Sequence, residues 1–123
     1  MRENEIGTAI LGAAIKIHSA LGPGLLESAY EACLAHELAL AGFNFERQKV
    51  LSILYDGIAI ERGYRLDLLV EGRIVIEVKA VDQLSNLHRA QVLSYLRLGG
   101  FRLGYLLNFN VPLMKDGIAR LAN

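Results

Sequence analysis

Apolar residues recur every three or four positions in two stretches near the start of the chain. The first stretch runs from Asn4 to about Leu21, and the second runs from Leu26 to about Gly42. This spacing places the apolar side chains on one face of an α-helix. Because Gly22-Pro23-Gly24 separates the two stretches, the pattern predicts two helices joined by a short turn.

From Phe45 onward the pattern changes to short apolar runs that are separated by turn residues. These runs predict strands over 45–54, 58–61, 64–70, 74–80 and 101–109. Gly63 is suited to a bend or bulge between two of them. Ser85 is a suitable N-cap for a helix that ends near Leu98, before Gly99-Gly100. The segment 111–123 is expected to form a short terminal helix or a packed tail.

The helix expected after Ser85 carries polar residues at the spacing of its apolar ones. Its predicted inner face consists of Leu87, Gln91, Ser94, Tyr95 and Leu98. Buried Gln and Tyr side chains need hydrogen-bond partners, which a site on the sheet would supply. An ordinary half-buried Tyr with a Gln at the rim is the alternative.

Composition indicates one folded domain spanning residues 1–123, with 53% apolar and 21% charged residues. No apolar stretch approaches the roughly 18 residues of a membrane span, so no membrane association is expected. The first residues lack the pattern of a signal peptide, which leads us to expect a cytoplasmic protein. The single cysteine, Cys33, is expected to be a small core residue.

The 13 basic and 13 acidic residues cancel, so no whole-molecule field attracts nucleic acid or an anionic membrane. Any contact with nucleic acid must therefore be local. Basic residues that could line one face, or that could simply be solvated, are Arg47, Lys49, Arg62, Arg65, Arg89, Arg97 and Arg102.

Asp67, Glu77 and Lys79 place charges on two neighbouring apolar strands, where an uncompensated charge is costly. A divalent cation held by the two acids would compensate them, and an internal ion pair with Lys79 is the alternative. The length of the turn at Glu71-Gly72-Arg73 decides whether the side chains of Asp67 and Glu77 lie on the same face of the sheet or on opposite faces. A two-residue loop puts the two acids on opposite faces of the sheet, whereas a three-residue loop puts Asp67 opposite Glu77.

Glu27 falls in the first turn of the second helix, where the helix dipole favours negative charge. Tyr30 and Glu31 share its side of the helix. An acid at this position is also common simply as a helix-starting residue.

The segment Gly24-Leu25-Leu26-Glu27-Ser28-Ala29-Tyr30 resembles the signature of the GxxExxY proteins, a family placed in the PD-(D/E)XK nuclease-like superfamily. The resemblance continues through 63–68, 76–80, 91–95 and 107–109. It implies a fold of the α/β class, more narrowly α+β, with a restriction-endonuclease-like core. That core is an α-β-β-β-α-β mixed sheet flanked by helices, here with an extra N-terminal helix.

The resemblance also implies roles for individual residues. Asp67 and Glu77 match the metal-binding acids, Glu27 matches the helix acid that completes the metal site, and Lys79 matches the catalytic lysine. Gln91 matches a glutamine on the following helix. Tyr30 and Tyr95 are expected to support the site or to face the substrate. The implied cofactor is Mg²⁺, for which Mn²⁺ can substitute, and the implied reaction is phosphodiester hydrolysis in nucleic acid, with DNA expected.

Two other functions remain open at this point. The chain could be a catalytically inactive nuclease-like domain that binds nucleic acid or a protein partner. It could also be an interaction domain in which Asp67, Glu77 and Lys79 form an internal ion network. Because 123 residues offer little surface for holding a duplex, a homodimer or a recruiting protein is also expected.

Overall fold

The computed structural model describes residues 2–123, which form three α-helices, five strands and one 3-10 turn. In chain order they are α1 (Arg2–Leu21), α2 (Glu27–Leu40), β1 (Phe45–Tyr55), β2 (Ile58–Val70), β3 (Ile74–Lys79), α3 (Asn86–Gly99), β4 (Leu103–Asn108), η1 (Met114–Gly117) and β5 (Ile118–Ala122). The strands form one sheet in the order β1-β2-β3-β4-β5. Only the β3–β4 pair is parallel within this described part of the chain, and α3 makes the crossover between them. The expected mixed sheet flanked by helices is confirmed.

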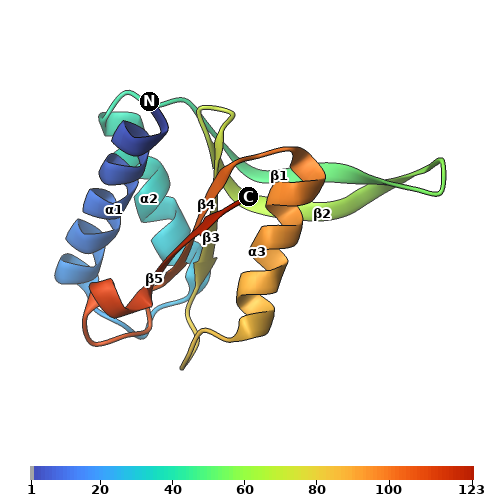
Figure 1. Cartoon of the computed structure of the whole chain (residues 1–123). Helices are drawn as coiled ribbons and strands as arrows, with labels where there is room; N and C mark the ends of the chain where they lie inside the picture. The colour runs from blue at the N-terminus through green and yellow to red at the C-terminus, as the bar shows by residue number, and fades with distance from the viewer. Residues whose placement is uncertain (1) are drawn as a thin grey trace.

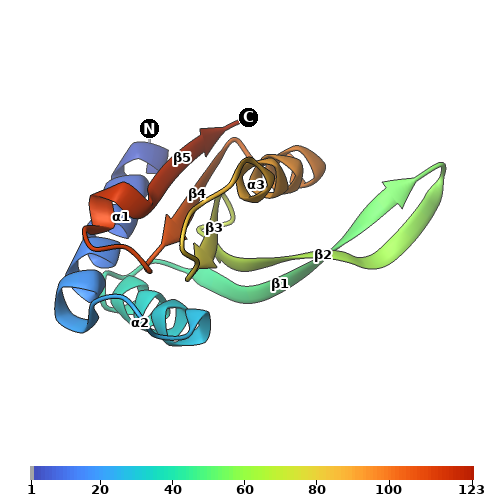
Figure 2. The same cartoon turned by 90° about the horizontal axis from the view of Figure 1, so that it is seen from below.

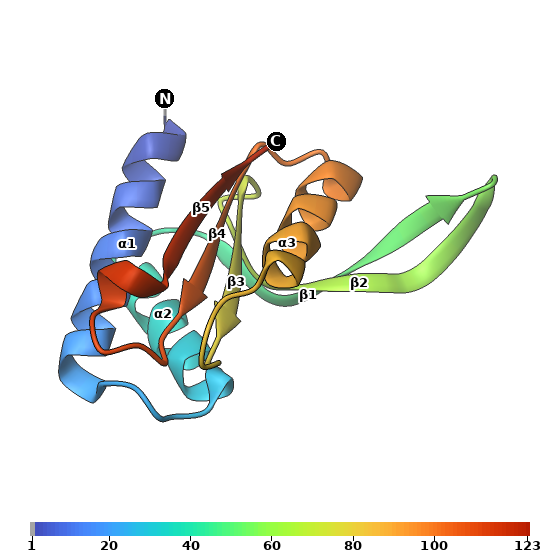
Figure 3. The same ribbon diagram turned by 60° about the horizontal axis from the view of Figure 1, so that its bottom comes forward.

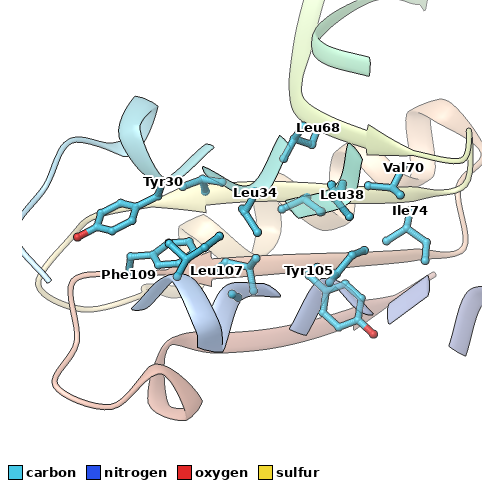
Figure 4. Close-up of a cluster of buried hydrophobic side chains, with 14 of the residues drawn as sticks. Tyr30, Leu34, Leu38, Leu68, Val70, Ile74, Tyr105, Leu107 and Phe109 are labelled. Carbon is cyan, nitrogen blue, oxygen red and sulfur yellow. The ribbon is translucent and has the colours of Figure 1, made fainter. Parts of the chain in front are cut away.

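Helices cover both faces of the sheet, with α1 and α2 on one face and α3 on the other (Figures 1 and 2). Two separate hydrophobic clusters fill the layers between helices and sheet. The predicted apolar faces of the first two helices pack in the larger cluster through residues such as Ile10, Ile17 and Leu34. Tyr30 and Phe109 stack there with ring centroids 4.4 Å apart (Figure 4). This packing anchors α2 against the centre of the sheet.

The β1–β2 hairpin extends far beyond the rest of the molecule as a two-stranded arm, seen in all three ribbon views (Figures 1–3). The sequence predicted two strands separated at Gly63, but the structure has one long strand with a bulge. Leu51 pairs with Tyr64 and Ile53 pairs with Ile60, so the ladder shifts between them. A Cβ on Gly63 would lie 2.5 Å from the Ile53 side chain, which explains why glycine is needed at the bulge.

The turn between β2 and β3 has three residues, which is the length required for Asp67 and Glu77 to lie on the same face of the sheet. Val70 pairs with Ile74, and the register continues to Leu68 opposite Ile76. The regular ladder ends there, and beyond it the Asp67 N–H donates to Glu77 Oε1, so the two acids lie next to each other across the two strands. The longer turn, on which the shared site depends, is therefore confirmed.

Helix α3 begins and ends as predicted, but a different stripe of it packs on the sheet. Ser85 caps its start and Gly100 closes it in the left-handed conformation, with φ of 72°. The buried residues are Val92 and Leu96, whereas Leu87 is 78% exposed. These two side chains lie close to Gly104 of β4, where a Cβ would be only 3.1–3.2 Å from them. The docking stripe is thus set by the small residue beneath it.

The predicted inner-face residues have different surroundings from those expected. Leu98 is exposed, like Leu87, so both were wrongly assigned to the docking face. Gln91, Ser94 and Tyr95 flank the docking stripe and are partly buried.

The C-terminal segment forms a strand, which the sequence did not predict. After the η1 turn, β5 runs antiparallel to β4, with Leu107 opposite Ile118 and Leu103 opposite Ala122. Gly117 passes so close to the backbone of Asn108 that a Cβ there would collide with its carbonyl. This close passage lets the chain reverse direction and cover the edge of β4. No helix within 2–123 is long and apolar enough to cross a membrane.

Candidate functional site

A pocket of about 360 Å³ opens where the start of α2, the β1–β2–β3 sheet and α3 meet. Its lining residues are Glu27, Val50, Arg62, Tyr64, Arg65, Asp67, Glu77, Lys79, Gln91 and Tyr95. The structure thus brings together all the predicted site residues except Tyr30. The predicted acids and the lysine, which are separated along the chain, thus line one concave site.

The β2–β3 ladder changes character at this pocket. Beyond the Leu68–Ile76 pair, the carboxylates take over part of the backbone pairing. The Val78 backbone N–H donates to Asp67 Oδ2 over 2.9 Å, and the Asp67 N–H donates to Glu77 Oε1 over 3.2 Å. Both acids are therefore fixed by backbone groups of the partner strand.

Strand β2 also rotates at this point. Leu66 and Leu68 are two residues apart and would share a face in a regular strand. Instead, Leu66 packs in the cluster under α3 and Leu68 packs in the cluster under α1 and α2. On the neighbouring strand β1, Gln48 has a positive φ of 52°. Asp67 lies between these two residues, at the change of face, and lines the pocket.

Burial is the main cause that raises the pKa of both acids, and repulsion from a neighbouring carboxylate adds to it in each case. Glu77 is only 5% exposed, and its burial, followed by the repulsion from Asp67, raises its pKa to about 8. Burial also raises the pKa of Asp67, and the nearby Glu31 adds to this effect. The hydrogen bond from Val78 and the charge of Lys79 oppose the increase for Asp67 without cancelling it. Ionisation of both acids together is therefore unfavourable in the metal-free protein.

Lys79 lies beside the two acids but does not form a close ion pair with Glu77. Its Nζ is 3.9 Å from Glu77 Oε2, which is beyond hydrogen-bonding distance. The high pKa of Glu77 persists despite this neighbour. A fully satisfied internal ion pair would lower that pKa, so the geometry leaves the ammonium available to another group in the pocket.

Glu27 is the first residue of α2 and lies exposed at the pocket wall. Its position depends on the turn that precedes it. The Tyr30 hydroxyl donates to the Gly22 carbonyl over 2.6 Å and accepts from the Leu25 N–H over 3.1 Å. Tyr30 itself is fully buried against Phe109 and does not line the pocket (Figure 4). It cannot face a substrate there, so of the two expected roles only support of the site is compatible with its position.

The donor atoms of the pocket suit a divalent cation in part. Asp67 and Glu77 offer hard carboxylate oxygens in a buried setting where ionisation of both acids is unfavourable without a cation, which favours binding of such an ion. However, no group of three or more His, Cys, Asp and Glu residues in the described chain is already arranged to hold a metal. The facing pair fits the ion, whereas Glu27 would have to approach it before the three predicted ligands could act together.

Sequence reasoning missed a polar network behind the acids. Glu31 is 6% exposed and accepts hydrogen bonds from Arg47 Nε, over 3.0 Å, and from Gln48. The Gln48 amide also lies 3.4 Å from Asp67 Oδ1. The network links α2 to β1 and β2 and steadies Asp67. Its only sequence signal was the position of Glu31 on the same side of the helix as Glu27.

Helix α3 supplies the polar wall opposite the start of α2. The Gln91 side-chain amide donates to the Tyr95 hydroxyl over 3.0 Å. Tyr95 stacks on Tyr64 with centroids 5.0 Å apart, and burial together with the nearby Glu77 raises its pKa. Both Gln91 and Tyr95 thus lie where the sequence expected them, at the acids. Tyr64 and the arm residues Arg62 and Arg65 were not assigned to the site.

The fold and the pocket together define a nuclease-like domain. A five-stranded mixed sheet with three helices is consistent with the restriction-endonuclease-like fold. A family model described as the PD-(D/E)XK nuclease superfamily matches residues 4–121. The chain belongs to this superfamily, whose nucleases generally use divalent metals and act on nucleic acid. Comparison with curated proteins and with solved structures finds no significant match.

Proposed function

We propose that the protein is a metal-dependent nuclease that hydrolyses phosphodiester bonds, with DNA as the expected substrate. One observation carries the proposal: Asp67 and Glu77 face each other in a pocket, with raised pKa values and with Lys79 beside them. Such uncompensated acids are typical of sites that bind a cation. Membership of the nuclease superfamily supports the same reaction.

In the proposed mechanism Asp67 and Glu77 hold the ion, and Mg²⁺ is the expected one, with Mn²⁺ as a substitute. A bound divalent cation supplies Lewis acidity that polarises the phosphodiester and lowers the pKa of a water molecule. Lys79 orients the attacking water or stabilises the negative charge that develops on the phosphate oxygens. The Asp67 carboxylate is held for this task by the Val78 N–H, so little reorganisation is needed.

Three further residues are proposed to complete the site. Glu27 adds a third carboxylate when it approaches the pair from the start of α2. Gln91 and Tyr95 hydrogen-bond each other and present polar atoms at the opposite wall. Their proposed task is to bind the substrate or to orient the groups that touch it.

We also propose that the protein belongs to the narrower GxxExxY family. Each residue that defines the signature has a local task that supports the assignment. Gly24 has φ of 103°, which other residues rarely adopt. Glu27 lines the pocket, and Tyr30 fastens the turn before it.

The proposal includes the organisation of the protein. Both hydrophobic clusters pack on the same sheet, which supports a single domain over 1–123. The small size supports a homodimer or a recruiting protein as an aid to holding nucleic acid.

A cleavage assay on purified protein tests the reaction. Plasmid and oligonucleotide substrates are incubated with Mg²⁺ or Mn²⁺, and with EDTA as the metal-free control. We expect metal-dependent cleavage that falls by about 100-fold or more in Asp67→Ala and Lys79→Ala. The matched controls are Asp116→Ala and Lys115→Ala, which change exposed residues outside the pocket. Equal cleavage by all four variants would reject the assigned roles.

A second candidate function is nucleic-acid or protein binding without cleavage. It is favoured by the absence of a ready-made cluster of three metal ligands within residues 2–123. Titration calorimetry with Mg²⁺ and Mn²⁺ separates the two candidates, because a binding module has no need of the ion. Metal binding by the wild type that is lost in Glu77→Gln supports the nuclease.

A further inference from the structure

The base of the projecting arm forms one wall of the acid pocket. Val50, Arg62, Tyr64 and Arg65 all belong to β1 or β2 and line this pocket together with Asp67 and Glu77. Val50 and Arg65 are cross-strand partners in the ladder. The arm, which projects from the sheet in Figure 3, is therefore continuous with the site.

The bulge at the base of the arm gives Arg62 its place in this wall. Ile53 pairs with Ile60 and Leu51 pairs with Tyr64, so three residues of β2, Arg62 among them, oppose the single residue between these positions on β1. Arg62 adopts a positive φ of 57°, a conformation that is unfavourable for an arginine. Strained residues and bulges of this kind concentrate next to functional sites, where they redirect a side chain.

Both arginines of the pocket are without an internal partner. Among residues 2–123, neither Arg62 nor Arg65 forms an ion pair or a side-chain hydrogen bond. By contrast, Arg47 and Lys49 on the same hairpin are paired with Glu31 and Glu46. The two guanidinium groups are thus free to take a ligand from solvent.

The charges of the pocket indicate which ligand suits them. Its lining contains three carboxylates, from Glu27, Asp67 and Glu77, and three cationic side chains, from Lys79, Arg62 and Arg65. With a divalent cation on the acids, the pocket would carry excess positive charge and would attract an anion. Guanidinium groups bind phosphate through paired hydrogen bonds, which makes a phosphate oxygen the matching ligand.

We propose that Arg62 and Arg65 form a phosphate-binding subsite on the arm, which holds the nucleic-acid backbone next to the phosphodiester at the acids. The arm then lies along the bound strand and compensates for the neutral net charge of the protein. The inference rests on the proposed function for its choice of nucleic acid as ligand. It adds two binding residues on β2, the strand that also carries Asp67, to the acid and lysine positions.

Equilibrium binding tests the subsite separately from cleavage. Fluorescence anisotropy of a labelled DNA duplex is measured with Ca²⁺, over a series of NaCl concentrations, for the wild type, Arg62→Gln, Arg65→Gln and the double variant. Glutamine keeps most of the side-chain length and the same backbone strain at position 62, and melting temperatures verify folding. The matched control is Arg73→Gln, which removes one positive charge from the exposed β2–β3 turn outside the pocket.

We expect each pocket substitution to raise the Kd by about tenfold and to lower the salt-dependence slope by about one. The Arg73→Gln protein should bind within about twofold of the wild type. Wild-type affinity and an unchanged slope in the double variant would overturn the subsite, as would a wild type that binds no DNA.

The outcomes distinguish this inference from the proposed reaction. Metal-dependent cleavage together with unchanged binding by the double variant rejects the subsite and keeps the nuclease. Binding that requires both arginines, in a protein that cleaves nothing with Mg²⁺ or Mn²⁺, rejects the hydrolysis and keeps the subsite.

Discussion

The two ends of the β2–β3 hairpin are built from the same pair of strands but satisfy their backbones in opposite ways. At the turn end, Leu68, Leu69 and Val70 pair regularly with three apolar residues of β3, and all six side chains are at most 4% exposed. At the open end, the carboxylates of Asp67 and Glu77 accept the backbone N–H groups of the partner strand.

This difference shows that one end of the hairpin contributes mainly to stability, whereas the other end carries the candidate site. Burial of apolar side chains stabilises the turn end, whereas burial raises the cost of charge at the open end. The acids stay in place because the regular ladder beside them fixes both strands. The turn end thus supports an open end that the protein alone leaves electrostatically unfavourable.

The largest expected effect is the pH dependence that Glu77 gives to the metal-free protein. Its pKa is raised from 4.5 to about 8 in the folded state, so the folded protein binds this proton more tightly than the unfolded chain does. The contribution to stability is complete below the unfolded pKa and is lost as the pH rises towards 8. We expect a loss on the order of 4 kcal/mol across this range.

Urea unfolding of the wild type and Glu77→Gln in EDTA, from pH 5 to pH 8.5, measures this loss as the difference between the two proteins. Mg²⁺ should restore the wild type at pH 8 and leave the variant unchanged. A difference that does not vary with pH would contradict the assignment of the raised pKa.

At the turn end, Ile76→Ala should destabilise the fold by about 3 kcal/mol, because Ile76 is fully buried and its loss leaves a cavity. Urea unfolding at pH 6 measures the change. The folded variant should retain cleavage, since Ile76 does not line the pocket. The control is Ile60→Ala on the arm, where the side chain is 44% exposed and a much smaller change is expected. Equal losses at the two positions would break the contrast between buried ladder and exposed arm.

The Tyr30→Phe variant tests whether the start of α2 supports the site at the open end of the β2–β3 hairpin. The substitution removes the hydroxyl that bonds Gly22 and Leu25, and keeps the stacking ring. We expect a loss of about 1–2 kcal/mol in unfolding free energy and slower cleavage, because the turn before Glu27 is released. Tyr55→Phe at the arm tip, where the side chain is 71% exposed, is the matched control. A Tyr30 variant with wild-type stability would remove this support from the account.

The smallest effect is expected at the end of the arm. Ile58 is 60% exposed and pairs with Tyr55 next to the terminal turn. Ile58→Ser should change the unfolding free energy by less than about 0.5 kcal/mol, measured by urea unfolding. A loss comparable to that of Ile76→Ala would mean that the arm packs against something, for example a second copy of the chain.

Local signals in the sequence were enough to predict the elements that carry the site. Helical periodicity and caps located α1, α2 and α3 to within a few residues, because these features depend on neighbours along the chain. Alternation and turn residues located the strands that hold Asp67, Glu77 and Lys79. The resemblance to the PD-(D/E)XK superfamily is confirmed by the family match.

The length of the β2–β3 turn could not be decided locally. Glu71 and Gly72 both adopt positive φ and form a tight turn, closed by the Arg73 N–H to the Val70 carbonyl, 3.0 Å apart. Asn44, distant in sequence, exchanges backbone and side-chain hydrogen bonds with Glu71 and holds it there. Because side chains alternate along a strand, the length of this turn determines whether the two acids share a face of the sheet.

Tertiary packing likewise decided the docking stripe of α3, the strand β5 and the bulge that brings Arg62 to the pocket. In each case a glycine lets two neighbouring elements approach closely, as Gly104, Gly117 and Gly63 do. The sequence by itself determined the helices, the strands β1 to β4 and which of them carry the acids and the lysine, since periodicity and turn chemistry are local. Only the tertiary structure decided which side chains share a pocket, since a shift of one residue in register moves a side chain to the opposite face.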